Sequence, residues 1–311
     1  MKVLFIDTAH NYLAESLSKD GIQCHSLLLE TKEEIENIIE NYEGIIIRSR
    51  IKIDKQFIDK ATKLRFIARV GAGMENIDES YAKSKGIECL NSPEGNRDAV
   101  GEHAIGMLLS LFNNMCRANS EVKNNIWKRE PNRGVELSEK TVGIIGYGNM
   151  GSSFAKKLSG FDVEVISYDK YKFNYSDKYT KEVQLYDIFK YSDIVSFHVP
   201  LTPETKYMLN DAFISQFSKN IYLINTSRGK VASTNAIVNA MKKGKVLGVA
   251  LDVLEYEASS FEKLNNEDLA TWEFLVKSDN VILSPHIAGW THESNLKHAK
   301  ILHKKIQSLL F

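Results

Sequence analysis

Residues 141–169 read TVGIIGYGNMGSSFAKKLSGFDVEVISYD, and this stretch decides the fold. Its first five residues are mostly apolar and β-branched, as in a buried parallel strand. Gly146, Gly148 and Gly151 follow in the spacing G-x-G-x-x-G, and residues 149–158 then have helical periodicity. A second expected strand, 163–168, ends at Asp169. Strand, glycine turn, helix, strand and acid in this order are typical of a dinucleotide-binding βαβ unit.

Each of the three glycines has a separate task in such a unit. The first permits a tight turn, the second lets the backbone approach a pyrophosphate, and the third lets the helix pack closely on the strand. Phosphates favour the helix N-terminus because its N–H groups are unpaired and its dipole attracts anions. Asp169 is placed to bind the adenosine ribose hydroxyls and to repel a 2′-phosphate. The stretch therefore predicts NAD rather than NADP, and the alternative is a purely structural glycine turn.

The composition limits the possible partners. The chain has 311 residues, enough for two domains, and its 40 Lys and Arg residues balance 40 Asp and Glu residues. Because the charges balance, the chain has no net positive charge that would favour binding to nucleic acid. Cys24, Cys89 and Cys116 are widely spaced and lie outside any C-x-x-C, which argues against a disulfide framework or a metal site. Because no apolar run suits a signal peptide or a membrane span, we expect a cytoplasmic protein with small-molecule ligands.

Short apolar runs alternate with helical segments on both sides of the glycine stretch. This alternation is typical of right-handed crossovers in a parallel sheet. The expected strands are 3–6, 21–29, 45–47, 65–70, 87–90, 194–199, 221–225, 246–253 and 281–283, and the expected helices are 32–42, 53–61, 80–85, 204–217 and 234–243. A break at 91–96 precedes a long apolar helix at 99–118, and residues 255–279 form a polar insert.

The last segment, 291–310, is an amphipathic helix that needs an apolar surface to cover. The simplest such surface is the first domain. We therefore expect a discontinuous substrate domain, residues 1–97 and 287–311, with an NAD-binding domain, residues 98–286, inserted into it. The predicted fold class is α/β, with two doubly wound parallel-sheet domains.

Six motifs together resemble the D-isomer-specific 2-hydroxyacid dehydrogenases. In order along the chain they are RVGAGMENID (69–78), GYGNMG (146–151), HVPLTPET (198–205), NTSRG (225–229), ALDVLEYE (250–257) and SPHIAG (284–289). The resemblance implies a Rossmann NAD domain inserted into a flavodoxin-like substrate domain, and it places the family's catalytic residues on Arg228, Glu257 and His286. Further cofactor-binding positions that it implies are Ala72, Asn149, Met150, Val199, Thr226, Ser227, Asp252 and Gly289. Ala258 departs from the family, which usually has proline after the glutamate.

The chemistry explains why these three residue types are needed. Oxidation of a secondary alcohol needs an acceptor for the hydroxyl proton, and a neutral imidazole such as His286 suits that task. Glu257 would orient the ring and stabilise its protonated form. Arg228 would hold the substrate carboxylate and polarise the C2 oxygen. A histidine without this context is more often structural, and we expect His103 and His198 to be packing residues.

Substrate choice depends on the stretch GIIIRSR (44–50) and on the turn after the next strand. Arg48 and Arg50 would project together from the carboxyl end of a parallel strand, and a phosphate dianion fits two guanidinium groups. Phosphoglycerate dehydrogenases of the family have the same Arg-Ser-Arg. The backbone N–H groups at Val70 and Gly71 would bind the substrate carboxylate. The alternative for the arginines is a solvated strand end.

Several functions stay open. The first is NAD-dependent oxidation of 3-phosphoglycerate to 3-phosphohydroxypyruvate, the first step of serine synthesis. Others are hydroxypyruvate, glyoxylate or 4-phosphoerythronate dehydrogenase activity, and a non-enzymatic NAD-sensing module such as the family's corepressors. Because the chain stops after its terminal helix, we expect no serine-binding regulatory domain. The apolar residues of 99–111 predict a homodimer.

Overall fold

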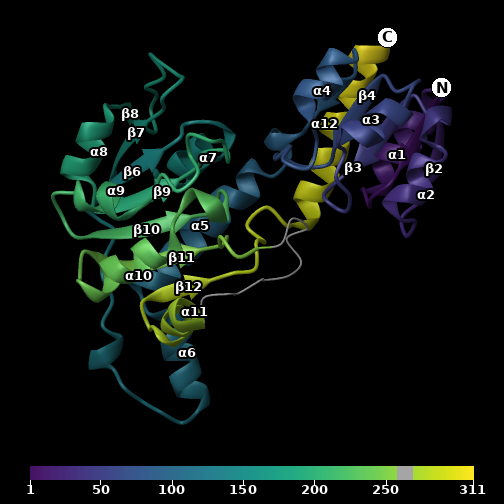
Figure 1. Ribbon diagram of the computed structural model, residues 1–311. Coiled ribbons are helices and arrows are strands. Elements are labelled where there is room, and N and C mark those ends of the chain that lie inside the picture. Colours follow the sequence, from purple (N-terminus) through teal and green to yellow (C-terminus); the bar gives the residue numbers. More distant parts are fainter. Residues whose placement is uncertain (258–268) are drawn as a thin grey trace. The chain divides into compact units, whose positions relative to one another are not determined.

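The chain divides into two compact units, which differ in how the chain builds them. The structure is a computed structural model that describes residues 1–257 and 269–311 (Figure 1). Unit 1 comprises Met1–Asn96 and Trp290–Phe311, so both ends of the chain contribute to it. Unit 2 comprises Arg97–Glu257 and, among the described residues, 269–289.

Unit 1 contains a five-stranded parallel sheet in the order β2-β1-β3-β4-β5. This is the flavodoxin-like order of doubly wound sheets. Its strands are β1 (Lys2–Phe5), β2 (Gln23–Ser26), β3 (Gly44–Ile47), β4 (Phe66–Arg69) and β5 (Glu88–Leu90). Side chains alternate along β1, so Val3 and Phe5 face one layer of helices while Leu4 and Ile6 face the other.

The C-terminal helix covers one face of this sheet, as predicted. Leu302 and Ile306 of α12 (His292–Leu310) pack with Leu13 and Leu17 of α1 (Asn11–Lys19) against Val3 and its neighbours. The opposite face carries α2 (Lys32–Glu36), η1 (Ile39–Asn41), α3 (Lys55–Lys60) and α4 (Glu79–Ser84). A short helix, η2 (Pro93–Gly95), ends the first part of the unit.

Unit 2 contains a seven-stranded parallel sheet in the order β12-β11-β10-β9-β6-β7-β8. Its strands are β6 (Thr141–Ile145), β7 (Glu164–Tyr168), β8 (Lys181–Glu182), β9 (Ile194–Phe197), β10 (Ile221–Asn225), β11 (Val246–Leu251) and β12 (Val281–Leu283). The strand order reverses at β6, which pairs with both β7 and β9. Ligands of doubly wound sheets bind at the carboxyl edge beside such a switch point. The predicted fold class is confirmed.

Helices cover both faces of this second sheet (Figure 1). On one face, α5 (Arg97–Phe112) and α7 (Asn149–Leu158) enclose a cluster that includes Leu108, Phe154 and Ile144. On the other face lie α8 (Leu185–Tyr191), α9 (Asp211–Ser215), α10 (Thr234–Lys242) and α11 (Leu269–Lys277). The remaining helices of the described residues are α6 (Met115–Lys123), η3 (Glu130–Asn132) and η4 (Gly229–Val231).

Several expected elements differ from the structure, and three of the differences are the largest. The single helix at 99–118 is two helices, because Asn114 adopts a left-handed φ of 52° between α5 and α6. The helix expected at 204–217 is only α9, which begins where the Asn210 side chain accepts the Phe213 N–H. Within the polar insert at 255–279 a helix, α11, is present; Ala258 and the other residues of 258–268 lie outside the described residues.

Candidate active site

The glycine turn lies after β6, at the switch point of the second sheet. Gly146 has a φ of 93°, and a Cβ there would come within 2.5 Å of the His198 carbonyl oxygen. A Cβ on Gly151 would collide with the Gly146 carbonyl oxygen. Gly148 differs, because a Cβ there would meet nothing within 4 Å. The first and third glycines are therefore required by packing, while the second borders open space.

That open space is where the sequence predicts the pyrophosphate of NAD. Gly148 is the N-cap of α7 and makes no side-chain cap, and Asn149 and Met150 form the first turn of this helix. The first N–H groups of a helix have no intrahelical partner and attract anions. After β10, the Thr226 hydroxyl is buried without a hydrogen-bond partner among the described residues. A bound cofactor would satisfy such a group, so these residues fit NAD.

Asp169 organises the turn from the end of β7. Its Oδ2 accepts the Tyr147 N–H at 2.9 Å, and its Oδ1 accepts the N–H groups of Tyr171 and Lys172 at 3.0 and 3.2 Å. The Lys172 ammonium donates in turn to the Tyr147 carbonyl oxygen at 2.8 Å. A carboxylate has about four acceptor positions, so Asp169 keeps capacity for a ribose hydroxyl.

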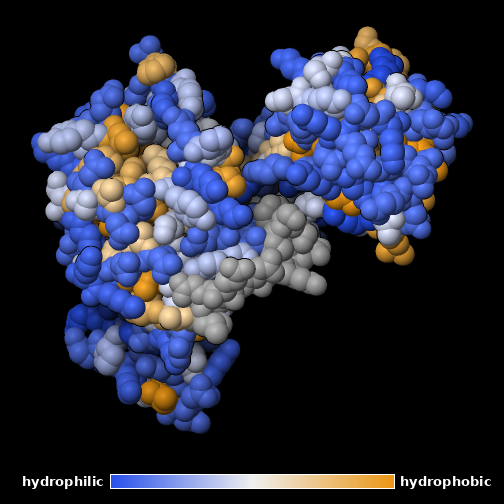
Figure 2. Space-filling model, in the orientation of Figure 1, coloured by the Kyte–Doolittle hydropathy of each residue, from blue (hydrophilic) through white to orange (hydrophobic). Residues whose placement is uncertain are grey.

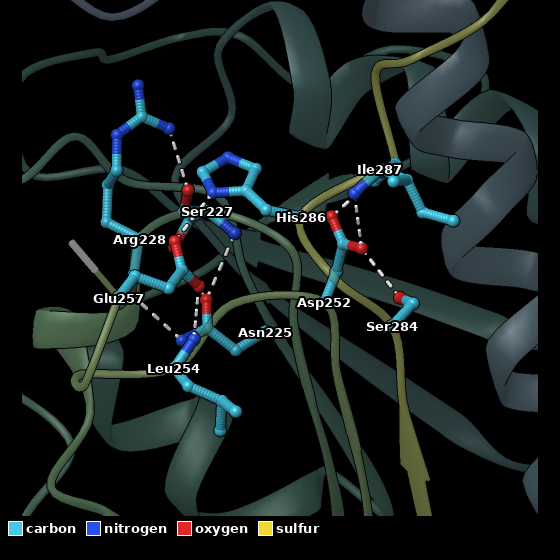
Figure 3. Close-up of polar contacts among 10 residues, drawn as sticks. Asn225, Ser227, Arg228, Asp252, Leu254, Glu257, Ser284, His286 and Ile287 are labelled. Atoms are coloured by element: carbon cyan, nitrogen blue, oxygen red, sulfur yellow. Dashed lines mark hydrogen bonds and ion pairs between the residues drawn. The ribbon is translucent and has the colours of Figure 1, made fainter. Parts of the chain in front are cut away.

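Arg228 lies in the turn after β10, and Asn225 fixes this turn. The Asn225 Oδ1 accepts the Ser227 N–H at 3.0 Å and the Ser227 hydroxyl at 2.8 Å, and its Nδ2 donates to the Arg228 carbonyl oxygen at 3.1 Å. The Arg228 Nη1 donates to the Ser227 carbonyl oxygen at 2.7 Å (Figure 3). A Cβ at Gly229 would collide with the Leu254 carbonyl oxygen, so this turn packs tightly on the loop after β11.

The His286 imidazole and the Glu257 carboxylate form a pair. Figure 3 shows the ring lying beside the carboxylate, and His286 Nδ1 is 2.7 Å from Glu257 Oε2. The other oxygen of Glu257, Oε1, accepts the Leu254 N–H at 2.5 Å. The two side chains are 21% and 13% exposed. We infer that Nδ1 carries the proton shared with the carboxylate, which leaves Nε2 as the nitrogen that can accept another.

Asp252 holds the loop that carries His286. Its buried carboxylate accepts the Ser284 hydroxyl at 2.6 Å and the Ile287 N–H at 2.9 Å (Figure 3). It also accepts the Ala288 N–H at 2.9 Å. Its backbone carbonyl accepts the His286 N–H at 2.7 Å. Asp252 was expected to contact the nicotinamide, and that role stays a prediction. In the structure, its carboxylate binds the Ser284 side chain before the predicted base and the backbone of the two residues after it.

His103 joins this network from α5. Its Nε2 lies 2.9 Å from the Ser284 hydroxyl and 3.5 Å from Asp252 Oδ1. Sequence patterns do not reveal this contact, because Ser284 is distant in sequence and a histidine on an apolar helix is usually a packing residue. His198 is such a residue: it packs on Phe154, and burial lowers its pKa to about 4.

In unit 1, the turn after β4 offers different donors from those expected. The Val70 N–H bonds to the Ile47 carbonyl oxygen at 2.8 Å, and the Gly71 N–H bonds to the Ser92 hydroxyl at 3.2 Å. These two groups are therefore occupied, which corrects the expectation that they bind a substrate carboxylate. Within the described residues, the N–H groups of 72–74 make no hydrogen bond, so the turn still presents backbone donors one residue later.

Arg48 and Arg50 do not project together. Strand β3 ends at Ile47, so the alternation of side chains along a strand does not extend to them. The Arg50 guanidinium donates to the carbonyl oxygens of Ile6, Leu27 and Glu30 at distances of 2.5 to 3.2 Å. These hydrogen bonds link the turn that carries Arg50 to two earlier backbone segments. They correct the expectation that Arg50 faces a phosphate.

The Arg48 guanidinium has a different environment. It lies over the Trp290 ring, 4.2 Å from the ring centroid, and makes no hydrogen bond within the described residues. Arg69 ends β4, and its guanidinium lies so close to Gly71 that a Cβ there would collide with it. Gly71 has a φ of 143°, which also favours glycine. The guanidinium of Arg48 thus has unused hydrogen-bond donors, whereas the guanidinium of Arg50 donates to backbone carbonyl oxygens.

Residues 1–257 and 269–311 contain neither a candidate metal site nor a candidate membrane-spanning helix. No group of three or more His, Cys, Asp or Glu side chains there has an arrangement that holds a metal ion. None of the helices in these ranges combines the length and the apolar character needed to cross a membrane.

Comparison with known proteins identifies the family. Residues 105–288 match the family described as D-isomer specific 2-hydroxyacid dehydrogenase, NAD binding domain. The chain belongs to the D-isomer-specific 2-hydroxyacid dehydrogenases. It is 34% identical over 290 residues to a hydroxypyruvate reductase from Thermotoga maritima, covering 93% of this chain and 92% of that protein. This dehydrogenase family membership confirms the predicted enzyme class, an NAD-dependent oxidoreductase.

Two further relatives bear on substrate and cofactor. A D-3-phosphoglycerate dehydrogenase from Archaeoglobus fulgidus is 32% identical over 311 residues, covering 99% of this chain and 57% of that longer protein. A crystal structure of D-lactate dehydrogenase from Aquifex aeolicus, complexed with NAD and lactic acid, has a TM-score of 0.83 at 28% identity. The match covers 100% of this dehydrogenase and 95% of the other chain. NAD is thus confirmed as the cofactor class.

Proposed function

We propose that this dehydrogenase oxidises 3-phosphoglycerate to 3-phosphohydroxypyruvate with NAD, the first step of serine synthesis. The environment of Arg48 is the observation that supports this substrate. The Arg48 guanidinium lies over an aromatic ring, and the described residues do not use its hydrogen-bond donors. A guanidinium suits phosphate because its planar set of donors matches the phosphate oxygens. Several relatives that span nearly all of this chain are D-3-phosphoglycerate dehydrogenases.

The proposed chemistry uses three residues of unit 2. His286 accepts the C2 hydroxyl proton at Nε2, because Glu257 occupies Nδ1 at 2.7 Å and stabilises the imidazolium that forms. Arg228 binds the substrate carboxylate and polarises the C2 oxygen. Asp252 keeps the His286 loop in place through its four hydrogen bonds. When bound, NAD supplies the acceptor for the hydride that leaves C2.

A second candidate is reduction of hydroxypyruvate. Two observations favour it: the hydroxypyruvate reductase matches this chain over most of both lengths, and Arg50 is committed to backbone carbonyl oxygens. With one arginine rather than two available, phosphate recognition rests on Arg48 and on any contribution from Arg69. The two candidates differ in whether a phosphate is required on the substrate and in the direction of the reaction.

A substrate panel separates the candidates. The purified protein is assayed by NADH absorbance with 3-phosphohydroxypyruvate, hydroxypyruvate, glyoxylate and pyruvate, and in the oxidative direction with 3-phosphoglycerate and glycerate. We expect the phosphorylated compound of each pair to have the higher kcat/KM. A higher kcat/KM for hydroxypyruvate than for its phosphate ester would replace the first candidate with the second.

We also propose a homodimer, but through a different surface from the one expected. Met107, Leu108 and Leu111 of α5 are buried inside unit 2, so they are not available to a partner. In contrast, α6 buries no residue, and Val122 and Trp127 are 51% and 79% exposed. Figure 2 shows hydrophobic atoms near the tip of this segment. Val122 lies on α6 and Trp127 follows its end, and exposed apolar residues that cluster on one segment mark a contact surface.

Light scattering tests the dimer. The unmodified protein should have twice the mass of one chain at micromolar concentration, and Val122→Asp combined with Trp127→Asp should have the mass of one chain. Tyr186→Asp, which changes an exposed aromatic residue on α8, is the control and should leave the mass unchanged. A monomeric unmodified protein would refute this proposal.

A further inference from the structure

Arg48 is held by two residues that are distant in sequence, Asp7 and Trp290. The Asp7 Oδ2 accepts the backbone N–H groups of Arg48, Ser49 and Arg50 at 3.1, 3.0 and 3.1 Å. Three successive N–H groups around one carboxylate oxygen fix the backbone of this turn. Asp7 therefore fixes the position of the Arg48 backbone from which the side chain extends.

Trp290 sets where the side chain ends. The guanidinium carbon of Arg48 lies 4.2 Å from the centroid of the Trp290 ring, which is within the range of a favourable cation–π contact. Stacking on a ring restrains the guanidinium plane but leaves its in-plane N–H donors available. The ring itself is 67% exposed, so burial in a core does not explain its position.

Charged side chains of both signs surround Arg48. Burial lowers the pKa of Arg48, and the Asp7 carboxylate opposes this effect. His298 lies close by on α12, bonded to the Ser92 hydroxyl and carbonyl oxygens at 2.8 and 2.9 Å. Burial is the main cause that lowers the His298 pKa to about 4; the charges of Arg69 and Arg48 act in the same direction, and the Ser92 hydrogen bond and the Glu94 charge oppose it. Arg48 and Arg69 therefore lie close enough to His298 for both positive charges to act on it.

We propose that Trp290 is a positioning residue for phosphate recognition, which orients the Arg48 guanidinium toward the phosphate group of a phosphate monoester. The identity of that monoester as the substrate rests on the proposed function, but the role of the ring does not. Arg50, two residues away, shows the other arrangement that such a side chain can adopt. Its guanidinium donates to three backbone carbonyl oxygens and is not available to a ligand. Without the ring, Arg48 would lose its restraint and populate other rotamers.

The first experiment measures anion binding without turnover. In a protein carrying Trp127→Phe and Trp272→Phe, Trp290 is the single tryptophan, and inorganic phosphate is titrated while its fluorescence is followed. We expect a saturable change that Arg48→Ala abolishes, whereas chloride at equal ionic strength produces none. No saturable change, or one that survives Arg48→Ala, would overturn the proposal.

The second experiment compares Trp290→Leu with Trp290→Phe in the complete enzyme. Because Phe keeps an aromatic face and Leu does not, Trp290→Leu should raise KM for 3-phosphohydroxypyruvate about tenfold, and Trp290→Phe should restore most of the loss. The KM for hydroxypyruvate and kcat should change less than twofold. Equal KM effects of Leu and Phe, or equal effects on both substrates, would contradict a positioning role.

The two experiments separate this inference from the proposed function. If phosphate binds through Arg48 and Trp290 but phosphorylated substrates are not preferred, the substrate assignment fails and the inference stands. If 3-phosphohydroxypyruvate is preferred and Trp290→Leu leaves its KM unchanged, the inference fails and the function stands. Thermal midpoints of all variants show whether any loss comes from unfolding.

Discussion

The residue on which the proposed chemistry depends, His286, has a backbone conformation that is uncommon for a side chain of its size. Its φ is 56°, in the left-handed region, and the surrounding bonds enforce it. The His286 N–H is bonded to the Asp252 carbonyl oxygen, and the next two N–H groups are bonded to the Asp252 carboxylate. Strain of this kind persists where the neighbouring structure holds it, and here it directs the ring toward Glu257.

Replacement of His286 tests its assignment as the base. His286→Ala should lower kcat by about 10²- to 10⁴-fold, the usual contribution of general acid–base catalysis, and should leave the Kd for NADH within twofold. Glu257→Gln should cause a smaller loss, because the ring keeps a hydrogen-bonding neighbour but loses a charge. Steady-state kinetics and a fluorescence titration with NADH measure the two quantities. Near-normal kcat in His286→Ala would show that another group takes the proton.

At this scale the sequence predicted residue types better than their contacts. Asp169 was placed correctly at the end of β7, because strand, turn and helix patterns are local. The hydrogen-bond partners of the Arg50 guanidinium were not predictable, since Ile6, Leu27 and Glu30 belong to two earlier segments of the chain. Asp7 and Trp290 were missed for the same reason. The one local signal for Asp7 is its place directly after the expected first strand, 3–6.

Among the elements, α7 and its glycine turn are predicted to form the cofactor site. The three glycines are not equivalent: Gly146 and Gly151 are required by backbone contacts, whereas Gly148 borders open space at the N-terminus of the helix. A methyl group at that place leaves the protein's own packing undisturbed and occupies the room that a pyrophosphate needs. Folding and cofactor binding are thus separable at this position.

Gly148→Ala should therefore fold normally and lose at least tenfold in NADH affinity. Gly160→Ala is a matched control, because a Cβ at Gly160 also meets nothing within 4 Å but lies beyond the far end of α7. Fluorescence titration with NADH and thermal unfolding are the measurements. If both variants bound NADH equally well, the pyrophosphate would not lie against Gly148.

Elements with strong local signals were predicted with the same bounds as in the structure, notably α7, β10 and β12. The errors have physical causes. The Asn113-Asn114 break between α5 and α6 depends on a left-handed asparagine that apolar periodicity does not reveal. The α9 helix begins only at its Asn210 cap, although the preceding residues have a helical pattern.

For the whole molecule, two buried histidines couple stability to pH. Burial lowers the pKa of both His198 and His298 to about 4. An unfolded histidine titrates near 6.5, so below that pH the unfolded chain binds protons that the folded chain does not. Each histidine therefore contributes stability above about pH 6.5 that is progressively lost as the pH falls toward 4. The loss is on the order of 3 kcal/mol per group.

His298→Asn should make the fall of the thermal midpoint between pH 6.5 and 4 shallower than in the unmodified protein. His292→Asn, on the exposed start of the same helix, is the control and should leave the pH dependence unchanged. Circular dichroism melts at several pH values measure both. An unchanged slope in His298→Asn would mean that His298 is protonated in the folded state at these pH values.

The central claim is that this NAD-dependent dehydrogenase recognises a phosphorylated 2-hydroxy acid through Arg48. The most direct test is the ratio of kcat/KM for 3-phosphohydroxypyruvate to that for hydroxypyruvate, compared among the unmodified enzyme, Arg48→Ala and Arg50→Ala. A charge-assisted contact contributes about 1.5 to 3 kcal/mol, so Arg48→Ala should lower the ratio roughly ten- to a hundredfold. Arg50→Ala should reduce both activities alike, because its guanidinium supports the backbone. An unchanged ratio in Arg48→Ala would contradict the claim.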